Sequence, residues 1–324
     1  MAAVTGAMAD VTLSGNVNQG YTTDKITSAA NATTKTTGLK SASAGSFLTF
    51  AGNEDLGSGL KASFKIETGM GMNNAGDVVG AAVDGSAAGN REAWVALAGG
   101  FGSVTLGNQY TQAFLTAAAV DPNGVNNIAG YGPVAIIGGA NGVERPNTIT
   151  YALPTLVTGL GVTVQKQSGT ASSGALNASG TSAAAGNGTG YGINYIAGDL
   201  MVGTSNQSDA STTIGAAKNK LTVSSVSYDL HVAKLAYTTL KNTSASNVVS
   251  KGDFYAVSAP FGAVSVNYTW GKNSVASVNT KYSQAGAYYT LSKRSQLYAL
   301  MGNSKAAVGT AKESVTSFGI NHSF

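Results

Sequence analysis

Apolar and polar residues alternate along many short stretches of this 324-residue chain. In the segment 263–270, one face carries Val264, Val266, Tyr268 and Trp270, and the other carries Ser265, Asn267 and Thr269. The segments 60–67 and 284–291 repeat the same pattern. A period of two residues places successive side chains on opposite faces of an extended backbone. The pattern therefore predicts strands that have one apolar and one polar face.

Short and long connections separate these predicted strands in turn. The short links lie at 55–58, 99–100, 158–159, 197–199, 229–231, 260–262 and 292–294. The long links are rich in Gly, Ala, Ser, Thr and Asn, and they lie at 24–45, 71–89, 111–143, 168–189 and 242–250. Tight turns at one end and long loops at the other are typical of transmembrane β-barrels. The spacing predicts an all-β, antiparallel barrel of about 16 strands, formed by a single domain over residues 10–324.

Composition supports a barrel in a lipid bilayer. Only 10% of the residues are charged, against roughly 25% in an ordinary soluble domain. The sequence has no uninterrupted apolar run near the roughly 20 residues that a membrane-spanning helix needs. The 19 basic residues are spread thinly against 15 acidic ones, which argues against nucleic-acid binding. The absence of cysteine fits export through an oxidising compartment.

The side-chain inventory argues against an enzyme. Two histidines and no cysteine cannot form a His/Cys metal cluster or a Cys–His pair. The sequence implies no cofactor. A structural or adhesive surface protein without a pore is the alternative, because secreted β-solenoids share this composition. A solenoid should show a fixed short repeat, and the variable connections show none.

Both ends of the chain carry weaker signals. Residues 7–9, Ala-Met-Ala, resemble the end of a secretory signal, so 1–9 are expected to be a signal-peptide remnant or a tag, and a chance match stays open. At the other end, alternation places Phe318, Ile320, His322 and Phe324 on one face of a last strand. This strand must pair with the first one to close a barrel, and 11–15 is its expected partner.

Several segments resemble one protein family throughout the chain. They are 46–62, with Glu54-Asp55-Leu56-Gly57 and Gly59-Leu60-Lys61-Ala62, then 90–95, 100–107, 147–154, 291–294 and 318–324. This set resembles the Gram-negative general porins of the β-proteobacterial type. The resemblance implies a homotrimer of sixteen-stranded barrels in the bacterial outer membrane, surrounded by bilayer lipid and lipopolysaccharide. It also implies insertion by the barrel assembly machinery, with Phe318, Ile320, His322 and Phe324 as the assembly signal, and passive passage of small hydrophilic solutes and ions.

The resemblance further implies that the third loop, 111–143, folds into the lumen and forms a constriction. Family members line this constriction with arginines, but the matching positions here are uncharged: Phe47, Ala51, Asn108, Thr150, Asn321 and Ser323. The charged candidates that remain are Lys61, Lys65, Glu67, Arg91, Asp121, Glu144 and Arg145. Fixed charges on a pore wall set ion selectivity. We therefore expect weak selectivity, with a slight anion preference from Lys61, Lys65, Arg91 and Arg145. For Lys61 and Lys65, solvated lumen charge without a selective role stays open.

Overall fold

The computed structural model describes most of the chain. The described residues are 10–71, 91–126, 128–129, 132–133, 136–137, 142–168, 187–210, 217–276, 278–306 and 312–324. The expected signal remnant at 1–9 lies outside them. So do most of the expected long links at 71–89 and 168–189.

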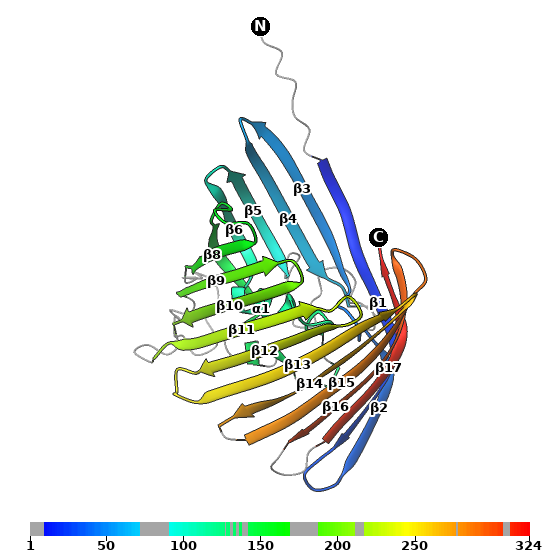
Figure 1. Ribbon diagram of the computed structural model, residues 1–324. Helices are drawn as coiled ribbons and strands as arrows, with labels where there is room; N and C mark the ends of the chain where they lie inside the picture. The colour runs from blue at the N-terminus through cyan, green and yellow to red at the C-terminus, as the bar shows by residue number, and fades with distance from the viewer. Residues whose placement is uncertain are drawn as a thin grey trace.

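Seventeen β-segments form one antiparallel sheet that closes on itself (Figure 1). The segments are β1 (Asp10–Thr27), β2 (Thr33–Lys40), β3 (Phe47–Gly57), β4 (Leu60–Gly69), β5 (Glu92–Gly99), β6 (Gly102–Tyr110), β7 (Glu144–Ala152), β8 (Leu160–Gln167), β9 (Gly188–Ala197), β10 (Leu200–Asp209), β11 (Asn219–Asp229), β12 (Lys234–Thr243), β13 (Val249–Phe261), β14 (Val264–Val275), β15 (Val278–Thr290), β16 (Ser295–Ala306) and β17 (Lys312–Ser323).

The seventeen segments make sixteen barrel strands. β2 pairs with Gly20–Thr27 of β1, and β3 pairs with Asp10–Asn16 of the same strand. β2 and β3 therefore lie end to end along one edge of β1 and together take the place of one strand. The predicted antiparallel barrel of about sixteen strands is confirmed, and a closed barrel excludes the solenoid alternative.

The first and last strands join as predicted, but in a different register. β17 pairs with Asn16–Thr27 of β1, and the Phe324 N–H donates to the Gly15 carbonyl at 3.1 Å. The expected partner, 11–15, was wrong except at Gly15, because β17 lies along residues 15–27 of β1, and among the described strands only β3 pairs with Val11–Ser14. Strands of a closed barrel are tilted and staggered, so the ends of β1 and β17 are offset along the seam.

One predicted long link is largely strand, and another has strand at both of its ends. Within 24–45, β1 continues to Thr27 and β2 begins at Thr33; within 242–250, β12 ends at Thr243 and β13 begins at Val249. Both segments are polar, which suggested loops. Threonine is β-branched and favours extended backbone even where no apolar face is buried, so these hairpins extend beyond the apolar part of the barrel.

The alternating faces are oriented as expected for a barrel in lipid. On β14, Tyr268 and Trp270 are 43% and 39% exposed on the outside. Asn267 and Thr269, on the other face of the same strand, are 8% and 5% exposed. The outer surface of the barrel is therefore apolar and aromatic, whereas the inner wall is polar.

The third loop enters the barrel, and it contains a helix that the sequence did not predict. Helix α1 (Gln112–Ala118) is capped by Thr111, whose hydroxyl accepts from the Phe114 N–H. It lies inside the ring of strands in Figure 1. Its buried Ala113 and Ala117 pack in one cluster with Leu221 and Val223 of β11. Among the described residues, no helix is both long and apolar enough to cross a membrane.

Glycines on the inner face of β9 leave space for the loop. A Cβ atom at Gly192 would lie 2.6 Å from Oε1 of Gln112 on α1. At Gly188, it would lie 2.3 Å from Oδ1 of Asp209. Any larger residue at these positions would displace the groups that connect the loop region to the wall.

Candidate pore constriction

Neutral amide side chains of the wall hold the third loop across the lumen. Near its start, Gln165 of β8 donates to the Tyr110 carbonyl at 3.0 Å and accepts from the Gln112 N–H at 3.2 Å. Gln207 of β10 accepts from the Ala113 N–H at 3.0 Å. Gln284 of β15 accepts from the Ile128 N–H at 3.0 Å. The contacts run from β8 to β15, so the described part of the loop crosses the interior of the barrel.

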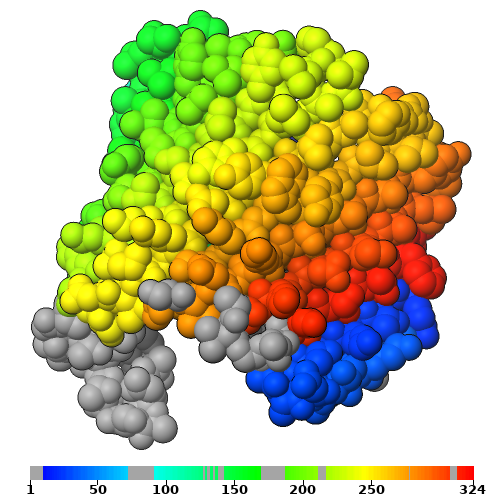
Figure 2. Space-filling view, turned by 60° about the horizontal axis from the view of Figure 1, so that its bottom comes forward, coloured from blue at the N-terminus to red at the C-terminus, as the bar shows by residue number. Residues whose placement is uncertain are grey.

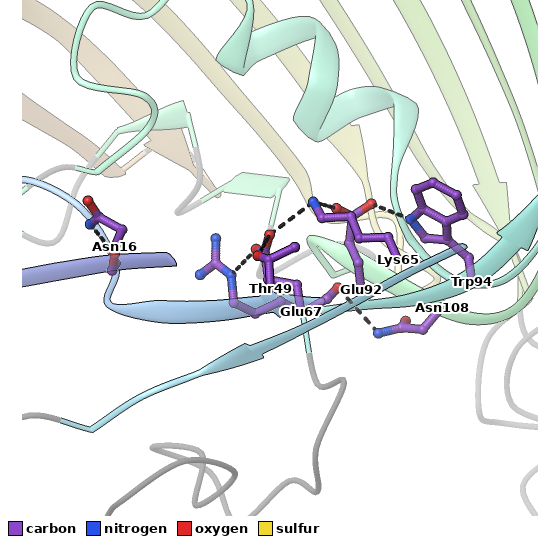
Figure 3. Close-up of polar contacts among 9 residues, drawn as sticks. Asn16, Thr49, Lys65, Glu67, Glu92, Trp94 and Asn108 are labelled. Carbon is purple, nitrogen blue, oxygen red and sulfur yellow. Dashed lines mark hydrogen bonds and ion pairs between the residues drawn. The ribbon is translucent and has the colours of Figure 1, made fainter. Parts of the chain in front are cut away.

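Four charged residues form a compact cluster at β4 and β5, shown in Figure 3. Lys65 lies between two carboxylates: its Nζ is 2.9 Å from Glu67, and it also forms an ion pair with Glu92. Arg91 Nε is 2.6 Å from the Glu67 carboxylate. Two cations therefore face two carboxylates. The sequence candidates Lys65, Glu67 and Arg91 are brought together here.

Neutral side chains complete this cluster. Thr49 donates to Glu67 at 3.1 Å, and the Trp94 indole N–H donates to Glu92 at 3.1 Å. The Arg91 guanidinium lies over the Phe47 ring, with Cζ 5.0 Å from the ring centroid. In the family that the sequence resembles, the position of Phe47 tends to carry a basic residue. A ring can stack on a guanidinium by cation–π attraction, whereas a second cation would repel it.

Arg145 is far more buried than a pore-lining charge would be. It is 1% exposed and forms a salt bridge with Asp209 of β10 through Nη2. A charge on the barrel wall acts on passing ions only where the passage reaches it. Arg145 is thus part of the packed wall, and the carboxylate beside it balances its charge.

The other candidates belong to neither of these groups, although Glu144 lies close enough to Arg91 to attract it electrostatically. Asp121 lies in the third loop, where burial raises the pKa of its carboxyl to about 6, although the Asn123 and Val125 N–H groups donate to it. Glu144 is half-buried at the start of β7 and pairs in register with Tyr110. Lys61 is exposed near the β3–β4 turn and forms no ion pair within the described parts of the chain.

Uncharged residues occupy the wall where β1 meets β17. Asn16 donates from Nδ2 to Asn321 Oδ1 at 2.9 Å, and Asn18 donates to the same oxygen at 3.1 Å. Ser323 donates to Asn16 Oδ1 at 3.1 Å. Two positions that are usually basic in the family, Asn321 and Ser323, therefore belong to a neutral hydrogen-bonded network.

Sequence reasoning missed several residues of this region. Glu92 lies in the segment 90–95, which carries part of the family resemblance. The sequence did not indicate it as a constriction residue, because its partner Lys65 is far away along the chain. Asp209 and the glutamines Gln165, Gln207 and Gln284 lie on polar faces of alternating segments. Alternation could have placed them in the lumen, but it could not identify which ones contact the loop. Within the described residues, no group of three or more potential metal ligands occurs.

The chain is similar to bacterial outer-membrane proteins. The model of the Gram-negative porin family matches residues 1–306. The major outer membrane protein P.IB of Neisseria lactamica is 39% identical over 105 residues, which are 32% of this chain and 28% of that relative. The match thus spans less than a third of the relative's length.

Solved structures show the same fold. The anion-selective porin from Comamonas acidovorans has a TM-score of 0.78 at 21% identity, over 98% of this chain and 100% of that one. The trimer form of OmpT from Vibrio cholerae has a TM-score of 0.64 at 13% identity, over 98% and 99%. These proteins establish the architecture that the two chains share with this one.

Proposed function

Because the chain belongs to the Gram-negative porin family, we propose that it forms a passive diffusion pore for small hydrophilic solutes and ions in the bacterial outer membrane. The observation that carries this proposal is the closed barrel with an apolar outer face, a polar inner wall and a loop held across the lumen by Gln165, Gln207 and Gln284. Such a barrel needs no cofactor and no catalytic residue to act as a pore.

We further propose that the pore is weakly selective. Lys65 and Arg91 face Glu67 and Glu92, so the formal charge of the cluster is zero. Arg145 is neutralised by Asp209 in the wall. A neutral cluster produces a short-range field that a passing ion in water barely senses. Any anion preference would therefore rest on Lys61, because the other three expected cations are paired.

Planar-bilayer recording tests both parts of the proposal. We expect open channels and a reversal potential near zero in a KCl gradient. A strong reversal potential of either sign would contradict weak selectivity but leave the pore intact. Absence of channels from correctly folded protein would contradict the pore itself. Liposome swelling with neutral sugars of graded size would then measure the radius of the passage.

A homotrimer is the proposed assembly. Exposed aliphatic and aromatic residues cover the outside of β3–β6, and examples are Phe50, Ile66, Val95 and Leu106. A surface of this kind can pack against a second copy as well as against lipid. The related fold of OmpT has been obtained in a trimer form. Heat-modifiable gel migration, together with light scattering in detergent, tests the oligomeric state. A single barrel at all protein concentrations would contradict the proposal.

The last strand is the proposed recognition element for the barrel assembly machinery. Phe318, Ile320 and Phe324 are 62%, 44% and 39% exposed on one face. His322 is exposed on that face too, with Nδ1 2.9 Å from the Ser295 hydroxyl. Replacing Phe324 by Ser should lower the amount of folded protein in cells, without changing refolding of the purified chain in detergent. Equal losses in both assays would instead indicate a purely structural role.

A further inference from the structure

A pocket lies on the inner wall of the barrel, between the third loop and two of the short turns. Its volume is about 390 Å³, and its lining includes Pro122, Ser258, Ser265, Asn267, Tyr288 and Gln296. Pro122 belongs to the third loop, and the other five residues lie on β13–β16. These strands lie side by side, from yellow to red, in Figure 2. Small-molecule sites have volumes of roughly 300–1,000 Å³. We call this site the inner pocket.

Strand register places the wall residues of the inner pocket in two neighbouring rows. In one row, Ser258 is opposite Asn267, and Asn267 is opposite Gly286. In the next row, Ser265 is opposite Tyr288. A Cβ at Gly286 would lie 2.5 Å from Oδ1 of Asn267 and 2.8 Å from Cε2 of Tyr288. The glycine therefore lets an amide and an aromatic ring approach each other on the wall of the pocket.

The loop side of the inner pocket is held in place by hydrogen bonds. Asn123, next to Pro122, donates from Nδ2 to the Thr269 hydroxyl at 2.6 Å and accepts from the Tyr288 hydroxyl at 3.4 Å. The Asn123 N–H donates to Oδ1 of Asp121 at 2.8 Å. Asp121 itself lines a separate, smaller cavity. The third loop therefore contributes the apolar ring of Pro122 to the pocket and keeps its carboxylate elsewhere.

The inner pocket offers hydrogen-bonding groups without charge. Its polar lining consists of two hydroxyls, two amides and one phenol, and none of the described residues that line it is ionised at neutral pH. Asn267 is 8% exposed, and its side chain forms a hydrogen bond with Tyr288. Its Oδ1 is buried and has no hydrogen-bond partner among the described residues. Buried polar atoms are nearly always hydrogen-bonded, so this oxygen favours a bound molecule that brings a donor.

These features favour a neutral solute that carries several hydroxyls. An ion in this pocket would lose hydration without gaining a counter-charge. A hydroxyl group both donates and accepts, so a molecule with several of them can match the serine and amide groups together. The ring of Tyr288 adds a flat surface, whose negative π-face attracts the weakly positive C–H groups of a saturated ring.

The wall beside the inner pocket is neutral as well. Gln296 is in register with Asn321 of β17. Asn321 accepts from Asn16 and Asn18 in the network at the seam between β1 and β17. A solute that leaves the pocket along this wall therefore meets further amides.

We propose that the inner pocket is a transit site for neutral polyhydroxylated solutes of monosaccharide size. The hydroxyls of the solute would bond Asn267, Gln296 and the two serines, and its ring would lie against Tyr288. Short turns form the periplasmic end of bacterial barrels, so the site lies on the periplasmic side of the third loop. The proposal names a solute class for the diffusion pore proposed above, and it rests on that pore.

Block of the ion current through single channels in a planar bilayer tests the site. The probes are D-glucose, D-glucuronate and a polyethylene glycol of the same hydrodynamic radius as glucose. Glucuronate adds a carboxylate to a similar ring, and the polymer has no hydroxyl along its chain. The wild-type channel should be blocked by glucose at a lower concentration than by either of the other probes.

Two variants remove the amide and the ring. We expect N267L and Y288L to raise the half-blocking concentration of glucose roughly 5-fold each, the order of one lost hydrogen bond. Y288F keeps the ring and should stay within about 2-fold of wild type. The matched control is N273L, because Asn273 is 6% exposed on the same face of β14 but lies outside the pocket lining. Its half-blocking concentration should not change.

Three results would overturn the proposal. The first is equal block by glucose and the polymer, which would indicate a purely steric passage. The second is block by glucuronate at least as strong as block by glucose. The third is unchanged glucose block in both N267L and Y288L. Absence of channels from folded wild-type protein would refute the pore and the site together, whereas normal channels without selective block by glucose would refute the site alone.

Discussion

Arg145 on β7 and Asp209 on β10 form a salt bridge across two intervening strands, and the arginine is 1% exposed. Gly188 and Gly190 of β9 leave room for it, since a Cβ at these positions would lie 3.2 Å and 3.8 Å from Nη1 of Arg145. The pair therefore fastens β7, where the third loop ends, to the wall beside α1.

Removing one partner of this pair should destabilise the barrel. We expect R145M to lower the free energy of unfolding by about 3–5 kcal/mol, because it leaves a buried carboxylate without a counter-charge. R145M/D209L should recover most of that loss. Urea titration of the folded protein, followed by tryptophan fluorescence, measures the difference. R294M, at an exposed turn, is the control. An R145M protein as stable as R294M would contradict the assignment.

The neutral cluster predicts a change in selectivity. E92Q should leave Lys65 and Arg91 facing Glu67 alone, which raises the formal charge of the cluster by one unit. The reversal potential in a KCl gradient should then shift toward anion preference. E54Q removes the same charge from a different strand, near the β3–β4 turn, and should shift it less. Equal shifts for both variants would show that the cluster does not face the ion path.

Glycine at position 192 should be needed for the position of the helix. In G192V, the new side chain would meet Gln112, whose Oε1 is 2.6 Å from a Cβ built there. We expect α1 to move away from β9 and the single-channel conductance to change. G38V is the control, because no atom lies within 4 Å of a Cβ at Gly38. Unchanged conductance in G192V would mean that Gln112 adapts without moving the helix.

Asp121 should make stability depend on pH. Its pKa is raised to about 6 from an ordinary value of 3.8, so the folded state holds the proton more tightly than the unfolded state. Stability should therefore decrease as the pH rises from about 4 to about 6, and then level off. D121N should be more stable than wild type at pH 7.5, by up to about 3 kcal/mol, and the advantage should vanish near pH 4. Urea titrations at both pH values measure the difference in free energy of unfolding between D121N and wild type. A difference that is the same at both pH values would contradict the pKa shift.

The strands and their faces could be predicted because each carries its own signal. The face with Tyr268 and Trp270 was apparent from alternation alone, since lipid contacts one side of every strand. The extent of the hairpins was not predictable in this way, because 24–45 contains few apolar residues whether it is strand or loop. Helix α1 was missed for a related reason: it is short, and contacts with β9, β10 and β11 stabilise it more than its own sequence does.

The charged cluster at β4 and β5 could be predicted in composition but not in connectivity. Alternation and family resemblance together indicated Lys65, Glu67 and Arg91. Neither could show that Glu92 completes the cluster or that Arg145 is buried against Asp209. These pairings depend on strand register and on the space left by Gly188, which are properties of the closed sheet rather than of any segment.

The pairing of β1 with β17 closes the barrel, so the sheet keeps two open edges until this seam forms. Asn16 and Asn321, which bond across it, are 305 residues apart in sequence. The entropy of bringing such distant residues together grows only slowly with length, so the cost at equilibrium is modest. The kinetic consequence is larger. Until β17 reaches β1, both strands expose unpaired main-chain groups that can pair with another molecule, so the protein stays open to edge-to-edge aggregation until the barrel closes.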